Sequence, residues 1–312
     1  MSGWSRNTLK TRNSQWKRFF NFCSDHNLTP LPASDRTVVR FLMFQSESST
    51  FNTVNNYLSA ICALHKFYGY QTDFRDSYMI KMFLSGIARI LGKKVKQKLP
   101  ISIEHLFLIY KKLDLSDPNT ITMWCAMVLC FRSLLRKSNV VPEEESFLGH
   151  TLRRKDAEFS RRGVVLSIKS TKTIQHLDRE LLIPLNFLDS SVLCVASMLR
   201  VHFMMCPRPL DSPLFWIKCD EPNKWRMMLY KDLLKFIKYC ISLIGLSDSD
   251  FGTHSLRRGG VQFLQSVGVP FQDLQFMGDW RSFAIMHYLV TPLERRFSIE
   301  DDISDRLDRL AL

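Results

Sequence analysis

Residues 121–135, "ITMWCAMVLCFRSLL", restrict the fold of this 312-residue chain more than any other segment. The apolar run is far shorter than the roughly 18 residues that a membrane-spanning helix needs, so we expect a helix buried inside a folded domain. The helix carries Arg132 and ends at Arg136, and a buried charge is costly unless it is paired. We therefore expect a counter-anion for Arg136: either a glutamate of the chain, from the run 143–145, or a bound anion.

The composition indicates a folded protein with an excess of positive charge. A hydrophobic fraction of 46% with 23 phenylalanines excludes a disordered chain, and the length suits one large or two moderate domains. The formal net charge is +13, and residues 1–95 hold thirteen Lys and Arg against five Asp and Glu. This excess favours a polyanionic partner, nucleic acid or a membrane surface, although solubility alone also explains it.

The cysteines and the start of the chain narrow the class of protein further. The eight cysteines form no CxxC pair or other zinc-binding spacing, so we expect reduced, buried thiols in an intracellular protein. The start "MSGWSRNTLK" is polar and lacks the apolar core of a signal peptide. We expect no membrane role.

Residues 1–91 have the apolar spacing of helices and almost no strand signal. Trp16, Phe19, Phe20 and Cys23 recur at helical intervals, and similar patterns follow up to a last helix over 74–91. This predicts a helical bundle whose aromatic side chains form a core, with base stacking as the alternative.

The segment 92–100, "GKKVKQKLP", predicts a basic linker ended by a proline. It has three interpretations: a solvated hinge, a strap that contacts phosphates, and a nuclear import signal. We favour a hinge that also contacts DNA phosphates through its lysines Lys93, Lys94, Lys96 and Lys98.

From residue 101 the pattern is mixed. Helices are expected at 102–113 and 119–135, and two strands at 163–170 and 179–185 are joined by a polar turn over 171–178. Further helices are expected at roughly 190–206, 230–245, 254–266, 271–277 and 283–290. The fold class is thus mainly α with a small β-hairpin or sheet, in two parts: an N-terminal helical domain over 1–91 and an α+β domain over 101–312.

The stretch "THSLRRGG", Thr253 to Gly260, predicts an anion site at the start of a helix. With Thr253 as the cap, His254 and Arg257 lie on one helix face near the positive end of the helix dipole. Gly259 and Gly260 would mark places where the helix packs too closely for side chains.

Three further residues have ordinary structural interpretations when each is taken alone. Lys172 in the turn between the strands is a solvated lysine, and Trp280, in the bend after Gly278, is a core residue. Tyr288 lies among apolar residues near the end of an expected helix that Ser282 caps, where a tyrosine normally packs.

Together, the motifs resemble the catalytic domain of tyrosine recombinases, the phage-integrase family. The residues in chain order are Arg136 in "LLRKS", Lys172, His254, Arg257, Trp280 in "MGDW", and Tyr288. The part "THSLRRGG … MGDWRS … Y" looks closest to recombinases of eukaryotic mobile elements of the Crypton type. The resemblance covers the whole chain, because 1–91 is similar to the helical core-binding domain of that family.

Two positions depart from the family pattern. Asn139 stands where the family usually has an acidic residue, three positions after the first arginine. The spacing from Trp280 to Tyr288 is one residue shorter than in many bacterial members. Tyr288 is nevertheless the last tyrosine of the chain, so no later residue could replace it.

The resemblance implies that Tyr288 attacks a DNA phosphodiester and forms a 3′-phosphotyrosyl intermediate, with no metal, ATP or other cofactor. Arg136 and Arg257 would grip the non-bridging oxygens with planar forks. His254 would be the base or a phosphate hydrogen-bond donor, and Lys172 the general acid. Trp280 would donate its indole N–H to a phosphate oxygen or brace the site by packing.

The expected partners are double-stranded DNA and further copies of the chain, as a dimer or tetramer on DNA. The tail 298–312 has apolar residues at helical spacing, which suits docking either on a neighbouring subunit or on its own domain.

We expect a nuclear location for a protein of a eukaryotic mobile element and a cytoplasmic one otherwise. Two alternative functions stay open: a type IB topoisomerase, and a domesticated DNA-binding protein that has lost catalysis.

Overall fold

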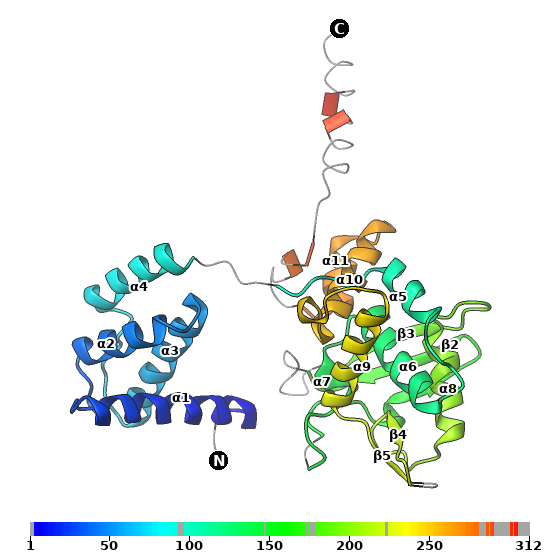
Figure 1. Ribbon diagram of the computed structural model, residues 1–312, viewed down its shortest axis with the longest axis horizontal. Helices are drawn as coiled ribbons and strands as arrows, with labels where there is room; N and C mark the ends of the chain where they lie inside the picture. Colours follow the sequence, from blue (N-terminus) through cyan, green and yellow to red (C-terminus); the bar gives the residue numbers. More distant parts are fainter. Residues whose placement is uncertain are drawn as a thin grey trace. The chain divides into compact units, whose positions relative to one another are not determined.

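The chain forms two compact units in the computed structural model, Met1–Gln97 and Lys98–Leu312 (Figure 1). The division falls within the basic segment 92–100. The structure describes residues 3–92, 97–146, 148–171, 174, 179–221, 224–280, 285, 286, 288, 289, 300, 301, 303 and 304.

The N-terminal unit consists of helices with polar caps. Its helices are α1 (Arg6–Asp25), α2 (Asp35–Ser46), α3 (Phe51–Phe67) and α4 (Tyr78–Leu91). Ser5, Ser34 and Thr50 cap the first three, and each side-chain oxygen accepts a backbone N–H three residues on. Helix α4 begins at Tyr78 rather than at 74, because the backbone of its N-cap, Ser77, is extended; Phe74 precedes the helix and is buried in the core of the bundle.

The aromatic residues of this unit form a core, as the sequence predicts. Phe19, Phe41 and Phe74 are inaccessible to solvent, and the rings of Phe19 and Phe41 meet edge to face with centroids 5.1 Å apart. Trp16 and Phe20 pack against this cluster from partly buried positions.

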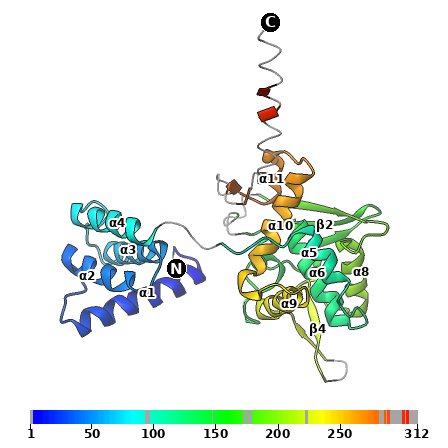
Figure 2. The same ribbon diagram turned by 45° about the horizontal axis from the view of Figure 1, so that its top comes forward.

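The C-terminal unit has more elements, and several of them pack around one helix. Its helices are α5 (Ile103–Tyr110), α6 (Pro118–Arg132), α7 (Lys137–Val140), α8 (Val195–Met205), α9 (Tyr230–Leu243), α10 (Thr253–Ser266) and α11 (Phe271–Met277). Helix α6 lies in the middle of the unit in both views (Figures 1 and 2) and packs against α8, α9 and α10. Its segment from Trp124 to Phe131 is buried throughout, as the apolar run predicts.

Helix α6 ends earlier than the sequence suggests. It stops at Arg132 with Ser133 as its C-cap, whereas the apolar pattern continues to 135. Leu134 has a φ of +54°, in the left-handed region, so the backbone leaves the helix there. Arg136 is consequently the N-cap of the short helix α7 rather than the last residue of α6.

The two predicted strands pair as an antiparallel hairpin, β2 (Gly163–Ile168) and β3 (Leu181–Asn186). A third strand, β1 (Ala157–Phe159), pairs with β2 and gives the order β1-β2-β3. A second hairpin joins β4 (Trp216–Lys218) to β5 (Trp225–Met227). The sequence did not predict β1, β4 and β5, because strands of three residues carry too little alternation to stand out.

Helix α10 approaches α6 and the segment before α5 through its two glycines. A Cβ on Gly259 would lie 1.7 Å from the carbonyl oxygen of Ile101, and a Cβ on Gly260 would lie 2.1 Å from that of Phe131. The prediction that these glycines mark close packing is therefore confirmed. The helix cap was predicted wrongly: Gly252 is the N-cap, and Thr253 is the first helical residue.

The segments after α10 pack around a small hydrophobic cluster. Helix α11 follows Pro270 and ends before Gly278, as predicted. The buried residues of this cluster are Leu134, Val261, Leu274, Trp280 and Ile285, and Tyr288 packs against them. The predicted helix 283–290, with its cap Ser282, and the predicted tail helix lie largely outside the described residues.

The eight cysteines are all described and none forms a disulfide; seven are buried. Among the described helices, none combines the length and the apolar character needed to cross a bilayer.

Candidate active site

Five of the six residues predicted for the site are described, and four of them meet in one place. His254 and Arg257 come from the first two turns of α10, Trp280 from the bend after α11, and Tyr288 from the segment that follows. Arg136, between α6 and α7, lies near enough for its charge to act on Arg257 and His254. Lys172 lies outside the described residues.

Tyr288 and His254 form a hydrogen bond. The phenol oxygen lies 2.5 Å from Nε2 of His254, and the two ring centroids are 5.2 Å apart. A turn places the tyrosine, since its N–H donates to the carbonyl of Ile285 at 2.8 Å. A neutral imidazole with a free Nε2 lone pair can accept the phenol proton at this distance.

The surroundings keep His254 neutral. Partial burial of the imidazole disfavours its charged form and lowers the pKa of His254 to about 4. The positive charges of Arg257, Arg258 and Arg136 lower this pKa as well. The ring retains an exposed side. At neutral pH the histidine is therefore a proton acceptor that faces both the tyrosine and the solvent.

Arg257 is buried and held by the backbone. Its Nη1 donates to the carbonyl of Leu134 and its Nη2 to that of Gly278. Burial lowers the pKa of Arg257 to about 9, and Arg136 adds to this effect, while Tyr288 and Asp279 oppose it. The guanidinium stays charged at neutral pH, and its two backbone bonds fix the plane of the fork.

Trp280 packs between Arg257 and Tyr288. Its ring centroid lies 3.8 Å from Cζ of Arg257 and 5.1 Å from the tyrosine ring centroid. A Cβ on Gly278 would lie 1.5 Å from an atom of the indole, so the glycine is required for this arrangement. Packing is one of the two roles that the sequence suggests for this tryptophan.

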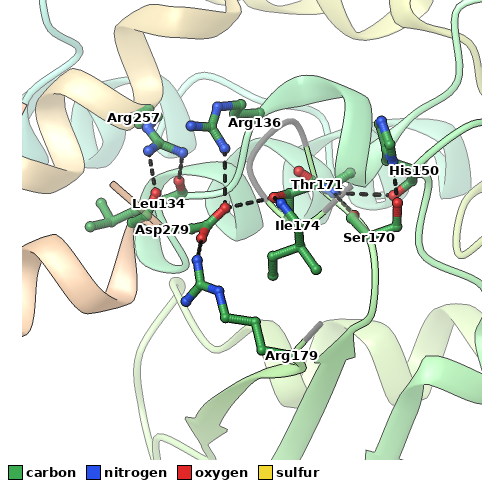
Figure 3. Close-up of polar contacts among 11 residues, drawn as sticks. Leu134, Arg136, His150, Ser170, Thr171, Ile174, Arg179, Arg257 and Asp279 are labelled. Carbon is green, nitrogen blue, oxygen red and sulfur yellow. Dashed lines mark hydrogen bonds and ion pairs between the residues drawn. The ribbon is translucent and has the colours of Figure 1, made fainter. Parts of the chain in front are cut away.

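The counter-anion of Arg136 is Asp279, rather than a glutamate from 143–145 as the sequence suggested. Nη1 of Arg136 lies 3.6 Å from Oδ2 of Asp279 (Figure 3). Glu143 instead pairs with Lys137 at 2.7 Å.

Asn139 has a structural role. Its side chain is buried, and Nδ2 donates to the carbonyls of His150 and Ser170, each at 3.1 Å. An acidic side chain here would face two carbonyl oxygens and repel them. The departure from the family pattern therefore fits the local hydrogen bonding.

The described part of the basic segment is bonded to the residues before α10: the N–H of Leu99 donates to the carbonyl of Asp250 at 2.8 Å. Nζ of Lys98 donates to the carbonyl of Ser249, so this lysine is bonded within the C-terminal unit. Lys93, Lys94 and Lys96 lie outside the described residues.

Asp279, Thr171 and Arg179 adjoin the candidate site and were not predicted from the sequence. The aspartate is part of "MGDW", and its signal was its place between the glycine and the tryptophan of that motif. Thr171 is the first residue of the polar turn 171–178 and Arg179 follows that turn, and a polar sequence gives no sign of which residues point inward.

A scan of family models found none that matches the chain. A curated relative is the "Integrase/recombinase xerD homolog" of Selenomonas ruminantium, which is 26% identical over 257 residues and covers 81% of this chain and 72% of its own length.

Solved structures share the fold over most of the chain. The Tn1549 transposon integrase in complex with transposon right-end DNA superposes with a TM-score of 0.63 at 14% identity, over 97% of this chain and 95% of its own. A lambda integrase dimer bound to a core site gives 0.61 at 14% identity, over 92% and 89%. The XerH site-specific recombinase bound to its difH substrate gives 0.55 at 17% identity, over 82% and 68%. The chain is thus similar in sequence to a curated integrase/recombinase and shares the fold of solved site-specific recombinases and integrases.

Proposed function

We propose that this protein is a site-specific DNA recombinase that cuts and rejoins duplex DNA through a covalent bond between Tyr288 and a 3′-phosphate. The observation that carries the proposal is the hydrogen bond of 2.5 Å between the Tyr288 phenol and Nε2 of His254, beside the buried fork of Arg257. The names of the curated relative and of the solved structures, which are recombinases and integrases, support it.

In the proposed reaction the phenol oxygen attacks the phosphorus while His254 takes its proton. Arg136 and Arg257 stabilise the charge that develops on the non-bridging oxygens. The bond from phosphorus to the 5′-oxygen breaks, and Lys172 gives that oxygen a proton. The phosphotyrosyl bond conserves the energy of the cleaved ester, so a 5′-hydroxyl can reverse the step and rejoin strands.

The experiment that tests this proposal is incubation of the protein with a pool of nicked duplex DNAs, followed by denaturing electrophoresis. We expect a covalent adduct in the presence of a chelator, with the DNA on the peptide that contains Tyr288. Tyr288→Phe should bind DNA and form no adduct, because only the nucleophilic oxygen is lost. Tyr239→Phe is the matched control, since Tyr239 is 54% exposed on α9, and its adduct should equal that of the wild type.

A second candidate is a DNA-binding protein without catalysis, which the missing carboxylate at position 139 favours. The same experiment separates the two: DNA binding without any adduct on every nicked duplex would select the binder. Relaxation of supercoiled DNA by a monomer would instead select a type IB topoisomerase.

We also propose that the chain assembles as a dimer or tetramer on DNA through its tail. The apolar positions Ile299, Ile303, Leu307 and Leu310 at helical spacing support this, as does the lambda integrase dimer among the related folds. Ending the chain after Phe297 should leave DNA binding intact and reduce the mass of the protein–DNA complex by light scattering. An unchanged mass would contradict the proposal.

We propose separately that the chain is related to recombinases of eukaryotic mobile elements and is located in the nucleus. It is supported by the motif "THSLRRGG … MGDWRS … Y" alone, and the curated relative is bacterial. A fluorescent fusion in a eukaryotic cell tests it: nuclear accumulation that is lost when Lys93 and Lys94 become alanine would support import, and uniform fluorescence would contradict it.

A further inference from the structure

Asp279 is the point at which three segments of the active site meet (Figure 3). Its side chain is 4% exposed and accepts a hydrogen bond of 2.6 Å from Oγ1 of Thr171. The same carboxylate accepts a bond from Nη2 of Arg179 and forms the ion pair with Arg136. One buried carboxylate thus joins the segment after α6, the base of the β2–β3 turn and the bend after α11.

The surroundings of Asp279 show that this residue, and not residue 139, supplies the carboxylate that pairs with Arg136. Asn139, three residues after Arg136, is neutral and uses its Nδ2 for two backbone carbonyls. Within the part of the chain that the structure describes, Asp279 is the one acidic side chain that forms an ion pair with Arg136. A φ of +53° at Asp279 lets it turn towards Arg136 while the next residue, Trp280, turns towards Arg257. Two adjacent residues, Asp279 and Trp280, therefore contact Arg136 and Arg257 respectively.

We infer that Asp279 is a positioning residue, whose carboxylate orients the Arg136 guanidinium towards the phosphate that Tyr288 attacks. The inference rests on the proposed function. The ion pair places Nη1 of Arg136 3.6 Å from Oδ2 of Asp279, and a guanidinium has five N–H donors, so donors of Arg136 remain for the phosphate.

The first test compares Asp279→Asn with Asp273→Asn on a nicked duplex that the wild type cleaves. Both changes remove one negative charge, but Asp273 is exposed on α11 and serves as the matched control. Asp279→Asn should lower the single-turnover rate of adduct formation at saturating DNA by about 10²-fold, because small errors in placement are costly at a reacting centre. The dissociation constant for DNA should not change, and Asp273→Asn should behave as the wild type.

A variant cycle separates positioning from a general loss of structure. In an Arg136→Lys background the planar fork is absent, so Asp279→Asn should lower the remaining rate by less than about threefold. Effects of the two changes that multiply would show that Asp279 acts independently of Arg136, and this would overturn the inference.

A spectroscopic readout tests the ion pair without relying on catalysis. The ¹⁵N signals of the Arg136 guanidinium, assigned by their loss in Arg136→Lys, should show hindered rotation in the DNA-free wild type and free rotation in Asp279→Asn. A freely rotating Arg136 in the wild type would overturn the inference, even if Asp279→Asn fails to fold. If the wild type forms no DNA adduct, the proposed function fails, and these spectra still decide the role of Asp279.

Discussion

Cζ of Arg257 lies 3.8 Å from the centroid of the Trp280 ring, while its two Nη atoms donate to the carbonyls of Leu134 and Gly278. The guanidinium plane is thereby fixed from three sides. Lysine has a single ammonium group, which cannot stack on the indole and reach both carbonyls at once. The position therefore requires arginine for its geometry as well as for its charge.

We expect Arg257→Lys to lower both stability and cleavage. Loss of a buried, charge-assisted hydrogen bond costs about 2 kcal/mol, and loss of a preorganised donor at the reacting phosphate lowers the rate about 10²-fold or more. Urea unfolding and adduct formation measure the two effects. Arg200→Lys is the control, because Arg200 stacks on Phe187 at 5.0 Å outside the site. Equal cleavage by Arg257→Lys and the wild type would contradict the assignment.

Acid should destabilise the protein through two histidines. The pKa values of His202 and His254 are each lowered to about 4, in both cases first by loss of hydration. The unfolded chain binds these protons near pH 6.5 and the folded chain does not, so the free energy of unfolding falls as the pH decreases from about 6.5 to about 4. Neither histidine changes stability above that window.

Urea unfolding between pH 7.5 and 4.5 checks this expectation. His254→Gln should reduce the slope of stability against pH and leave the contribution of His202, whose Nε2 accepts the N–H of Trp216 at 3.3 Å. An identical slope for His254→Gln and the wild type would show that His254 titrates normally.

The glycines of α10 provide a test of packing. Gly259→Ala should destabilise the C-terminal unit by about 3 kcal/mol, because the new Cβ would meet the Ile101 carbonyl oxygen, which belongs to the backbone and cannot rotate away. Gly86→Ala in α4 is the matched control: its Cβ meets nothing within 4 Å, so helix propensity should stabilise the N-terminal unit by about 1 kcal/mol. Circular dichroism during urea unfolding measures both changes, and a neutral Gly259→Ala would contradict the close approach.

DNA affinity should depend strongly on salt through residues 1–95. These residues hold thirteen Lys and Arg against five Asp and Glu, and contacts to phosphates release counterions. We expect the logarithm of the DNA association constant to fall steeply with the logarithm of salt concentration, and a chain without residues 1–95 to bind more weakly with a shallower slope. Equal affinity and slope for the two chains would show that this segment does not clamp DNA.

The apolar periodicity predicted most of the helices, because burial of one face or of all faces leaves a direct trace in the sequence. The segment around Arg136 could not be predicted in the same way. The apolar pattern runs on to Leu135, while the helix ends at Arg132, since the left-handed conformation of Leu134 comes from tertiary contacts rather than from its residue type. Arg136 is therefore the N-cap of α7, and it pairs there with Asp279.

In the candidate site, too, the features that follow from helical spacing could be predicted from the sequence, and those that depend on tertiary packing could not. His254 and Arg257 could be found from sequence because three residues of helix place them on one face. Their contacts with Tyr288 and Trp280, and the pairing of Asp279 with Arg136 across more than 140 residues of chain, depend on how α10, α11 and α6 pack. A pairwise contact between distant segments leaves no periodic signal in one sequence.

The small cluster around Leu134, Val261 and Trp280 is separate from the main core around α6. A set of few apolar contacts has a low free energy of local opening, so the segment that bears Trp280 and Tyr288 can open as its own cooperative unit while the main core stays folded. In hydrogen exchange, amides of α11 should therefore exchange well before those of α6. Opening of this segment would also take Trp280 and the carbonyl of Gly278 away from Arg257, so the nucleophile and the support of the Arg257 guanidinium would be released together.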